Sequence, residues 1–144
     1  MESSLIEKFD KERYLVIQLI TIGWAIWFGS QILQDLITTM SIRLIVVFVG
    51  LIGFSLFIVA LIKQFKLARK VNSSYILKEA LSNEMYRLYA YKSAFVGFWA
   101  ILITSGCLYI ISTFYDIPAL LACKFILFFG CLATFIATLV YNRG

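Results

Sequence analysis

The chain of 144 residues contains no histidine. Histidine is the side chain that most often binds metal ions, and it also serves as a general base and holds haem iron. The sequence has no glycine-rich phosphate-binding loop, and it lacks the Gly-x-Ser and paired-aspartate patterns of intramembrane proteases. We therefore predict a protein that is not an enzyme and that holds no metal ion and no other cofactor.

Charged residues are scarce as well. They make up 15% of the chain, while 62% is hydrophobic and the mean hydropathy is +0.91. Soluble domains contain about 25% charged and about 45–50% apolar residues. A short soluble chain leaves much of its surface in water, so it has no interior large enough for this excess. The composition indicates a single membrane domain over residues 1–144.

Four long apolar stretches divide the chain. About 20 apolar residues in a helix cross a hydrocarbon core about 30 Å thick. Helices are expected because lipid offers backbone groups no other partner, and the alternating pattern of a barrel is absent. The first stretch follows four acidic residues and precedes no small-residue cleavage site, so we expect it to remain as an anchor. The predicted fold is all-α, with transmembrane helices at residues 15–37, 44–62, 93–115 and 117–141.

The segment between the second and third stretches, residues 63–92, is strongly basic. Its seven cations and two acids leave a net charge of +5, whereas the N-terminal tail is nearly neutral. Cytoplasmic loops have such an excess, so we expect this segment and both termini to be cytoplasmic. Because anionic headgroups account for the charge, we predict contact with membrane lipids and no binding to nucleic acid. The basic face comprises Lys63, Lys66, Arg69, Lys70, Lys78, Arg87 and Lys92.

The two halves of the chain look alike. Each is predicted to form a helical hairpin with a tight turn, at residues 38–43 and 115–118, and the second span continues as a helix through Lys70. Gly23 in the first span corresponds to Gly97 in the third, and Gly53 in the second to Gly130 in the fourth. This pattern fits a parallel repeat about an axis along the membrane normal. It also fits any two apolar hairpins that share Gly, Trp and Ile by composition.

One short region resembles a known pattern. Leu81-Ser82-Asn83-Glu84-x-x-Arg87, followed by Lys92 and Gly97-Phe98-Trp99-Ala100, resembles small bacterial four-helix membrane proteins. In that family the residues read Asn/Asp-Asp-Glu-x-x-Arg, then a basic run, then a Gly-aromatic-Trp span. Ser82-Asn83 departs from the usual acid or amide pair. The family is uncharacterised, so the resemblance implies a bacterial inner membrane as the location and no particular activity.

Lys124 is the one charged residue inside the fourth span. It lies seven residues beyond Ile117, so about 10 Å from the outer end of the span. A charge at this depth must be paired, hydrated or able to reach headgroups. The side chain either reaches the outer headgroups unaided, forms a structural bridge with Asp35, or belongs to an outward-facing ligand or transport site. That site would contain Lys124, Asp35, Gln31 and Gln34, with Asp116 and Arg43 at its rim.

Two tryptophans occupy the middle of the first span. Trp24 and Trp27 are three residues apart and therefore share a helix face. Tryptophan usually prefers the membrane interface, so its place here needs a reason. Packing against glycine-containing neighbours is one interpretation. The other is a quinone or lipid pocket that also includes Trp99.

These observations favour a membrane protein that acts by association, as an accessory subunit, an assembly factor or an immunity protein. Its partner would be a second copy or another membrane protein. The first alternative is a small oligomeric channel or transporter that uses Lys124 and Asp35. Small multidrug exporters depend on a carboxylate deep in their first span, whereas Gln18 is the polar residue at depth here. The second alternative is a lipid- or quinone-binding helper built on the three tryptophans.

Overall fold

A computed structural model describes residues 2–75, 79 and 84–142 of the chain. Four long helices account for nearly all of these residues: α1 (Glu2–Leu36), α2 (Met40–Ser73), α4 (Glu84–Ser112) and α5 (Ala119–Tyr141). Each helix is long and apolar enough to cross a membrane, and the described ranges contain no strand. The predicted all-α fold with four transmembrane helices is confirmed.

The helix ends differ from the predicted spans mainly at the turns. α1 is one continuous helix from Glu2 to Leu36, so the charged N-terminal residues belong to the same helix as the first span. The first turn covers only residues 37–39, because α2 already begins at Met40. α2 continues as predicted past Lys70, and the backbone N–H of Ser74 donates to Val71 at its end. The second turn, residues 113–118, begins earlier than predicted because α4 already ends at Ser112. α5 begins at Ala119, directly after Pro118, because proline suits the start of a helix and not its interior.

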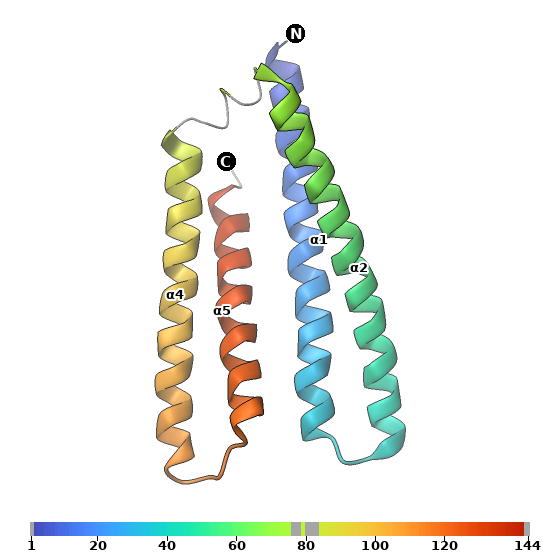
Figure 1. The fold of residues 1–144 in the computed structure, drawn as a ribbon, viewed down its shortest axis with the longest axis vertical. Helices are drawn as coiled ribbons and strands as arrows, with labels where there is room; N and C mark the ends of the chain where they lie inside the picture. The colour runs from blue at the N-terminus through green and yellow to red at the C-terminus, as the bar shows by residue number, and fades with distance from the viewer. Residues whose placement is uncertain (1, 76–78, 80–83, 143–144) are drawn as a thin grey trace.

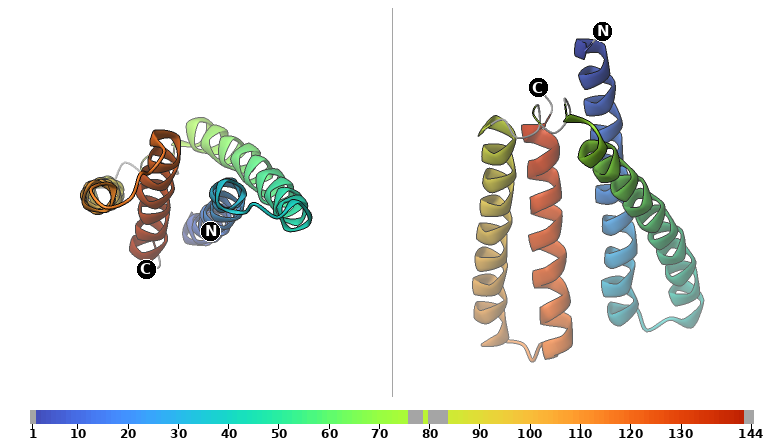
Figure 2. Two further views of the ribbon diagram at one scale, coloured as in Figure 1. Left: turned by 90° about the horizontal axis from the view of Figure 1, so that it is seen from below. Right: turned by 45° about the horizontal axis from the view of Figure 1, so that its top comes forward.

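The two hairpins stand side by side, with both turns at one end of the molecule and both chain termini at the other (Figure 1). α1 packs against α2, and α4 packs against α5. The hairpins meet through α1 and α5, so the helix order across the molecule is α2, α1, α5, α4 (Figure 2). The helices form an open row in which α2 and α4 are the outer members.

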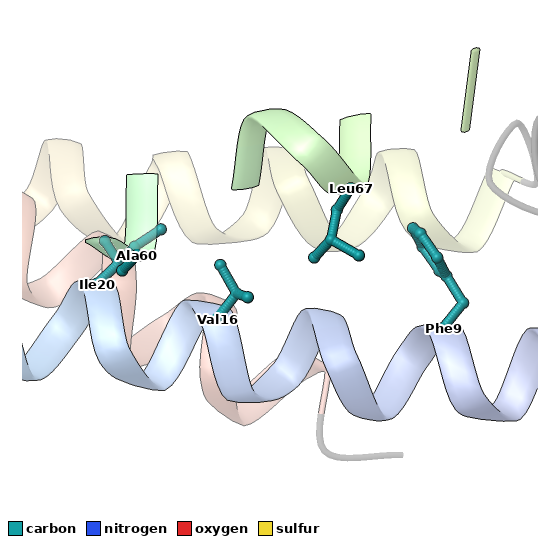
Figure 3. Packing of buried hydrophobic residues seen from close by; sticks show 5 residues of the cluster. All are labelled: Phe9, Val16, Ile20, Ala60 and Leu67. Atoms are coloured by element: carbon teal, nitrogen blue, oxygen red, sulfur yellow. The ribbon is translucent and has the colours of Figure 1, made fainter. Parts of the chain in front are cut away.

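The main buried cluster lies between α1 and α2, toward the end with the chain termini. Phe9, Val16 and Ile20 of α1 face Ala60 and Leu67 of α2 (Figure 3). Spacings of four and seven residues place these side chains on one face of each helix. Ala60 is completely buried, and its small side chain lets the two backbones approach closely.

Glycines mark the closest approach of the helices in the first hairpin. A Cβ atom on Gly23 would lie 2.7 Å from the backbone N of Phe57, and one on Gly53 would lie 2.6 Å from the backbone N of Trp27. Both distances are far below van der Waals contact, and both involve backbone that cannot turn aside. Only glycine allows this spacing of α1 and α2.

The second hairpin repeats these contacts. A Cβ atom on Gly97 would overlap the Thr134 side chain, and one on Gly130 would overlap Ile101. The contacts follow the same spacing in both hairpins. Gly23 meets Phe57, four residues after Gly53, and Gly97 meets Thr134, four residues after Gly130. Likewise, Gly53 meets Trp27 and Gly130 meets Ile101, each four residues after the first glycine of its hairpin. Equivalent residues of the two hairpins are therefore 74 positions apart on α1 and α4, and 77 apart on α2 and α5.

Candidate functional site

Lys124 and Asp35 form an ion pair that joins α5 to α1. The Lys124 Nζ donates to Asp35 Oδ2 at 2.5 Å, and the side chains are 21% and 34% exposed. Asp35 lies in the last turn of α1, and Lys124 in the second turn of α5. This geometry contains the bridge to Asp35 that was one of the three interpretations of Lys124.

The other four residues of the predicted polar site lie apart from that pair. Gln34 is directed toward α2, where its Nε2 is 4.0 Å from the position of a Cβ atom on Gly50. Gln31 is partly buried on α1, while Arg43 and Asp116 are exposed in the first turn of α2 and before α5. Within the described ranges, no hydrogen bond or ion pair connects these four to the bridge. Two of the six predicted residues are brought together.

A second polar junction lies at the opposite end of α1 and α5. Arg13 donates to Asn142 Oδ1 at 3.1 Å, and its guanidinium carbon lies 5.0 Å from the centroid of the Tyr86 ring. The Tyr86 hydroxyl donates to Asp10 Oδ2 at 3.0 Å. These contacts connect α1 to the end of α5 and to the first turn of α4.

α2 joins the same junction through an ion pair between Lys70 and Glu12, 3.2 Å apart. These contacts were not predicted, because the charges of the N-terminal residues nearly cancel and give no sign of specific partners. One signal was present: Asp10-Lys11-Glu12-Arg13 runs into the first apolar stretch with no Gly, Pro or capping residue between them. A continuous helix, and so fixed positions for these charges, follows from that absence of a breaker.

The two polar contacts between α1 and α5 are about one membrane thickness apart. We call Arg13–Asn142 the terminal clasp and Asp35–Lys124 the turn clasp. Arg13 and Asp35 are 22 positions apart on one helix, which corresponds to about 33 Å. The hydrocarbon core is about 30 Å thick. Both clasps therefore fit at the membrane boundaries, where headgroups and water reduce the cost of a charge.

Between the clasps, Trp24 and Trp27 pack in an aromatic cluster. The Trp24 ring stacks on Phe28 at 4.7 Å between centroids, and it lies 5.6 Å from Phe57 of α2 and 6.2 Å from Phe135 of α5. Trp27 stacks on Phe57 at 5.6 Å. The cluster touches three helices, so Trp24 and Trp27 pack against rings of α1, α2 and α5 in the structure.

Trp99 does not belong to this cluster. It lies on α4, is 48% exposed, and has edge contacts with the rings of Phe95 and Phe98. The indole N–H of Trp24 is buried and has no hydrogen-bond partner among the described residues. Trp24 therefore contributes its ring to the packing and makes no use of its polar atom.

The described cations of the predicted basic face are exposed on α2 and α4, and Lys78 and residues 81–83 of the family-like pattern lie outside the described residues. Lys92 lies near α5, with its Nζ 6.0 Å from the centroid of the Tyr141 ring. The exposed members are Lys63, Lys66, Arg69, Lys70, Arg87 and Lys92.

A groove of about 370 Å³ opens between α1 and α2 beside three of these lysines. Its wall is mostly apolar. Its charged residues lie just beyond the apolar stretches of α1 and α2, at the end of the groove nearer the chain termini. An apolar wall with a cationic rim suits the acyl chain and anionic headgroup of a phospholipid. The lining residues are Glu12, Leu15, Val16, Leu19, Lys63, Lys66, Leu67 and Lys70.

Chemically, these features fasten helices or bind apolar and anionic groups. In the part of the chain that the structure describes, no three His, Cys, Asp or Glu residues come together to hold a metal ion. Cys107, Cys123 and Cys131 are free thiols. No family model, curated protein or solved structure matches this chain.

Proposed function

We propose that this chain is a non-enzymatic protein of the bacterial inner membrane that acts through association with other membrane proteins. The observation that carries the proposal is the open row of helices. α2 packs on α1 and α4 packs on α5 at opposite ends of the row, and the outer faces of α2 and α4 are apolar and exposed over most of their length. Small residues and uncovered faces of this kind are how helices in membranes pair with one another.

The polar residues support the same proposal. The turn clasp and the terminal clasp join the hairpins, so the polar groups of Lys124, Asp35, Arg13 and Asn142 already have partners within the molecule. With no histidine in the chain, the commonest general base is missing too. Two hairpins fastened to each other suit a protein that binds partners through its outer faces.

We place the basic end of the molecule in the cytoplasm. The chain termini and the basic segment lie at the same end (Figure 1), so a single assignment orients the whole molecule. The excess of Lys and Arg over acidic residues in residues 63–92 favours the cytoplasmic side. The two short turns then face the opposite side of the membrane.

Native mass spectrometry after gentle extraction from the source membrane tests the proposal. A complex at a multiple of 16.5 kDa would indicate association between copies. A complex with an additional mass would identify a different partner and make the chain an accessory subunit. Monomer alone, under conditions that preserve other membrane complexes, would overturn the proposal.

Transport through the polar site is the weaker candidate, because Lys124 and Asp35 bond to each other across the helix interface. A transport site needs these groups available to a substrate for at least part of its cycle. If Lys124 carries transport, Lys124→Ala should abolish flux in liposomes. If the pair is a clasp, the variant should leave any flux unchanged and lower stability instead.

Lipid binding is a second candidate function, favoured by the groove between α1 and α2. Lys63 and Lys66 at its rim, beside the Lys70–Glu12 ion pair, would hold an anionic headgroup while the acyl chain lies along the apolar wall. We expect native mass spectra to retain phosphatidylglycerol and to lose phosphatidylcholine. Changing the three lysines to glutamine should remove the retained lipid. A control with the same charge loss at Arg69, Arg87 and Lys92, which do not line the groove, should keep it.

A further inference from the structure

The interface between the two hairpins is built from one face of α1 and one face of α5. Their contacts follow the length of the membrane: Arg13 with Asn142, Trp24 with Phe135, Phe28 with Phe128, and Asp35 with Lys124. α1 is the first helix of its hairpin and α5 is the second helix of the other. This contact uses the first helix of one hairpin and the second helix of the other. On two equivalent hairpins, the matching faces of the remaining helices, α2 and α4, are left without a partner helix.

The faces without a partner helix lie on the outer helices. Each α5 interface residue has an equivalent residue on α2, found 77 positions earlier in the sequence. These are Val47, Leu51, Ile58 and Phe65, and the last three are exposed apolar side chains. α2 therefore presents the α5-like face to the outside of the molecule.

α4 presents the other face. Each α1 interface residue has an equivalent residue on α4, found 74 positions later in the sequence. The α1 residues are Arg13, Trp24, Phe28 and Asp35. The equivalent residues are Arg87, Phe98, Leu102 and Tyr109, and all four are exposed. Arginine recurs at the first position, and large apolar or aromatic side chains occupy the other three.

The glycine contacts show that the two hairpins correspond in structure and not only in amino-acid composition. Gly23 and Gly97 occupy equivalent places against their partner helices, as do Gly53 and Gly130. Ala60 and Ala137, also 77 positions apart, are both buried. Since each hairpin has the same internal register, equivalent positions point in equivalent directions around their helices.

We propose that a second copy of this chain docks its α4 face (Arg87, Phe98, Leu102 and Tyr109) on the α2 face (Val47, Leu51, Ile58 and Phe65), repeating the α1–α5 contact between molecules. This inference rests on the proposed function, for which it names the partner as the same chain. The two helices run antiparallel, as α1 and α5 do, so both copies keep the same orientation in the membrane. The contact is head to tail, and it produces a ring if the rotation closes.

The contact between copies lacks the two polar clasps. Val47 and Tyr109 replace the ion pair of Lys124 and Asp35, and Phe65 stands in place of Asn142 beside Arg87. Packing of side chains alone then holds the copies together, because lipid supplies no hydrophobic force between helices. The assembly is therefore weaker than the fold of a single chain and requires mild detergent or an intact membrane.

Cross-linking in membranes tests the proposal. In a chain with Cys107, Cys123 and Cys131 changed to alanine, one population carries Ile58→Cys and a second, differently tagged, carries Phe98→Cys. These positions are equivalent to Phe135 and Trp24, whose rings are 6.2 Å apart. Because a disulfide requires Cα atoms within about 4.4–6.8 Å, a membrane-permeant bifunctional thiol reagent with a short spacer is used. We expect a mixed dimer from cells that contain both populations and none from either population alone.

Val59→Cys and Val96→Cys provide the matched control. They are exposed, lie at nearly the same membrane depth, and are turned away from the proposed faces by about 100° and about 160°. The mixed yield at the test positions should exceed the control several-fold. A second test pair, Leu51→Cys with Leu102→Cys, repeats the measurement at another depth, so one poorly folded variant does not decide the result.

Three results would overturn the inference: equal yields at test and control positions, dimers from a single population, or no dimer at either test pair. The second would indicate a symmetric, face-to-face contact. Failure here is distinct from failure of the proposed function. An oligomer seen by native mass spectrometry without these cross-links leaves association intact and removes only the head-to-tail contact.

Discussion

Lys124 and Asp35 show how two charges can be tolerated beside an apolar region. Both side chains are partly exposed, and they form an ion pair with each other. Their position at the membrane boundary lets water and headgroups solvate the side that faces away from the partner. The pair therefore stabilises the contact of α1 with α5 without enclosing a charge in lipid.

Removing one partner of this pair should destabilise the protein. We expect Lys124→Ala to lower the free energy of unfolding by about 1–3 kcal/mol, because the Asp35 carboxylate then loses its donor. The double variant Lys124→Ala/Asp35→Ala should lose less than the sum of the single variants. Unfolding in detergent, followed by circular dichroism, measures all three. Strict additivity would show that the two side chains are not coupled.

The Trp24 side chain allows its ring and its polar atom to be separated. Because the buried indole N–H has no partner among the residues that the structure describes, Trp24→Phe should lower the free energy of unfolding by less than about 1.5 kcal/mol. Trp24→Ala removes the stacked ring and should cost about 3–5 kcal/mol. The same unfolding measurement compares them. Equal losses would mean that the indole N–H makes a hydrogen bond in the membrane.

At this scale the sequence identified some residues and missed others for a physical reason. Lys124 and Trp24 were identifiable because each is unusual for its depth in a span. Arg13 and Asn142 are 129 positions apart, and each looks ordinary near the end of a helix. Their contact depends on α1 and α5 being neighbours, and hydropathy carries no information about which spans lie side by side.

Among the helices, glycine decides how closely each pair packs. Gly53 lies against the backbone of α1, whereas a Cβ atom on Gly106 of α4 would meet nothing within 4 Å. The two residues are both glycines in transmembrane helices, yet only one is required by its neighbour. This contrast provides a direct comparison within one chain.

We expect Gly53→Ala to lower the free energy of unfolding by about 1–3 kcal/mol, because α1 and α2 must move apart to accept a methyl group. Gly106→Ala is the control. It should be neutral or stabilising by up to about 1 kcal/mol, since alanine favours the helix. Thermal unfolding in one detergent measures both. Equal effects of the two substitutions would contradict the close packing at Gly53.

The existence of the four helices followed from the length of each apolar stretch, and their pairing in hairpins from the short turns. The helix ends were predicted unevenly: α2 continues past Lys70 as predicted, whereas the first turn is shorter and the second turn longer than predicted. The order of the helices required the structure. Nothing in four similarly apolar stretches identifies α1 and α5 as the inner pair.

For the whole molecule, four spans place both termini and the basic segment on one side of the membrane. In the cysteine-free background, we expect Thr38→Cys in the first turn to react with an impermeant thiol reagent added outside intact cells. Tyr75→Cys, just beyond α2, should react only after the membrane is permeabilised. The reverse pattern would invert the proposed orientation while leaving the fold unchanged.

The ion pair between Asp35 and Lys124 also imposes an order on biosynthesis. The two residues are 89 positions apart, and translation proceeds at about 5–20 residues per second. Asp35 therefore reaches the membrane on the order of 4–18 s before its partner has been made. During this interval the first hairpin must be held by its own glycine contacts, with its carboxylate hydrated at the membrane boundary. α5, which leaves the ribosome after α1, α2 and α4, completes the join between the two halves.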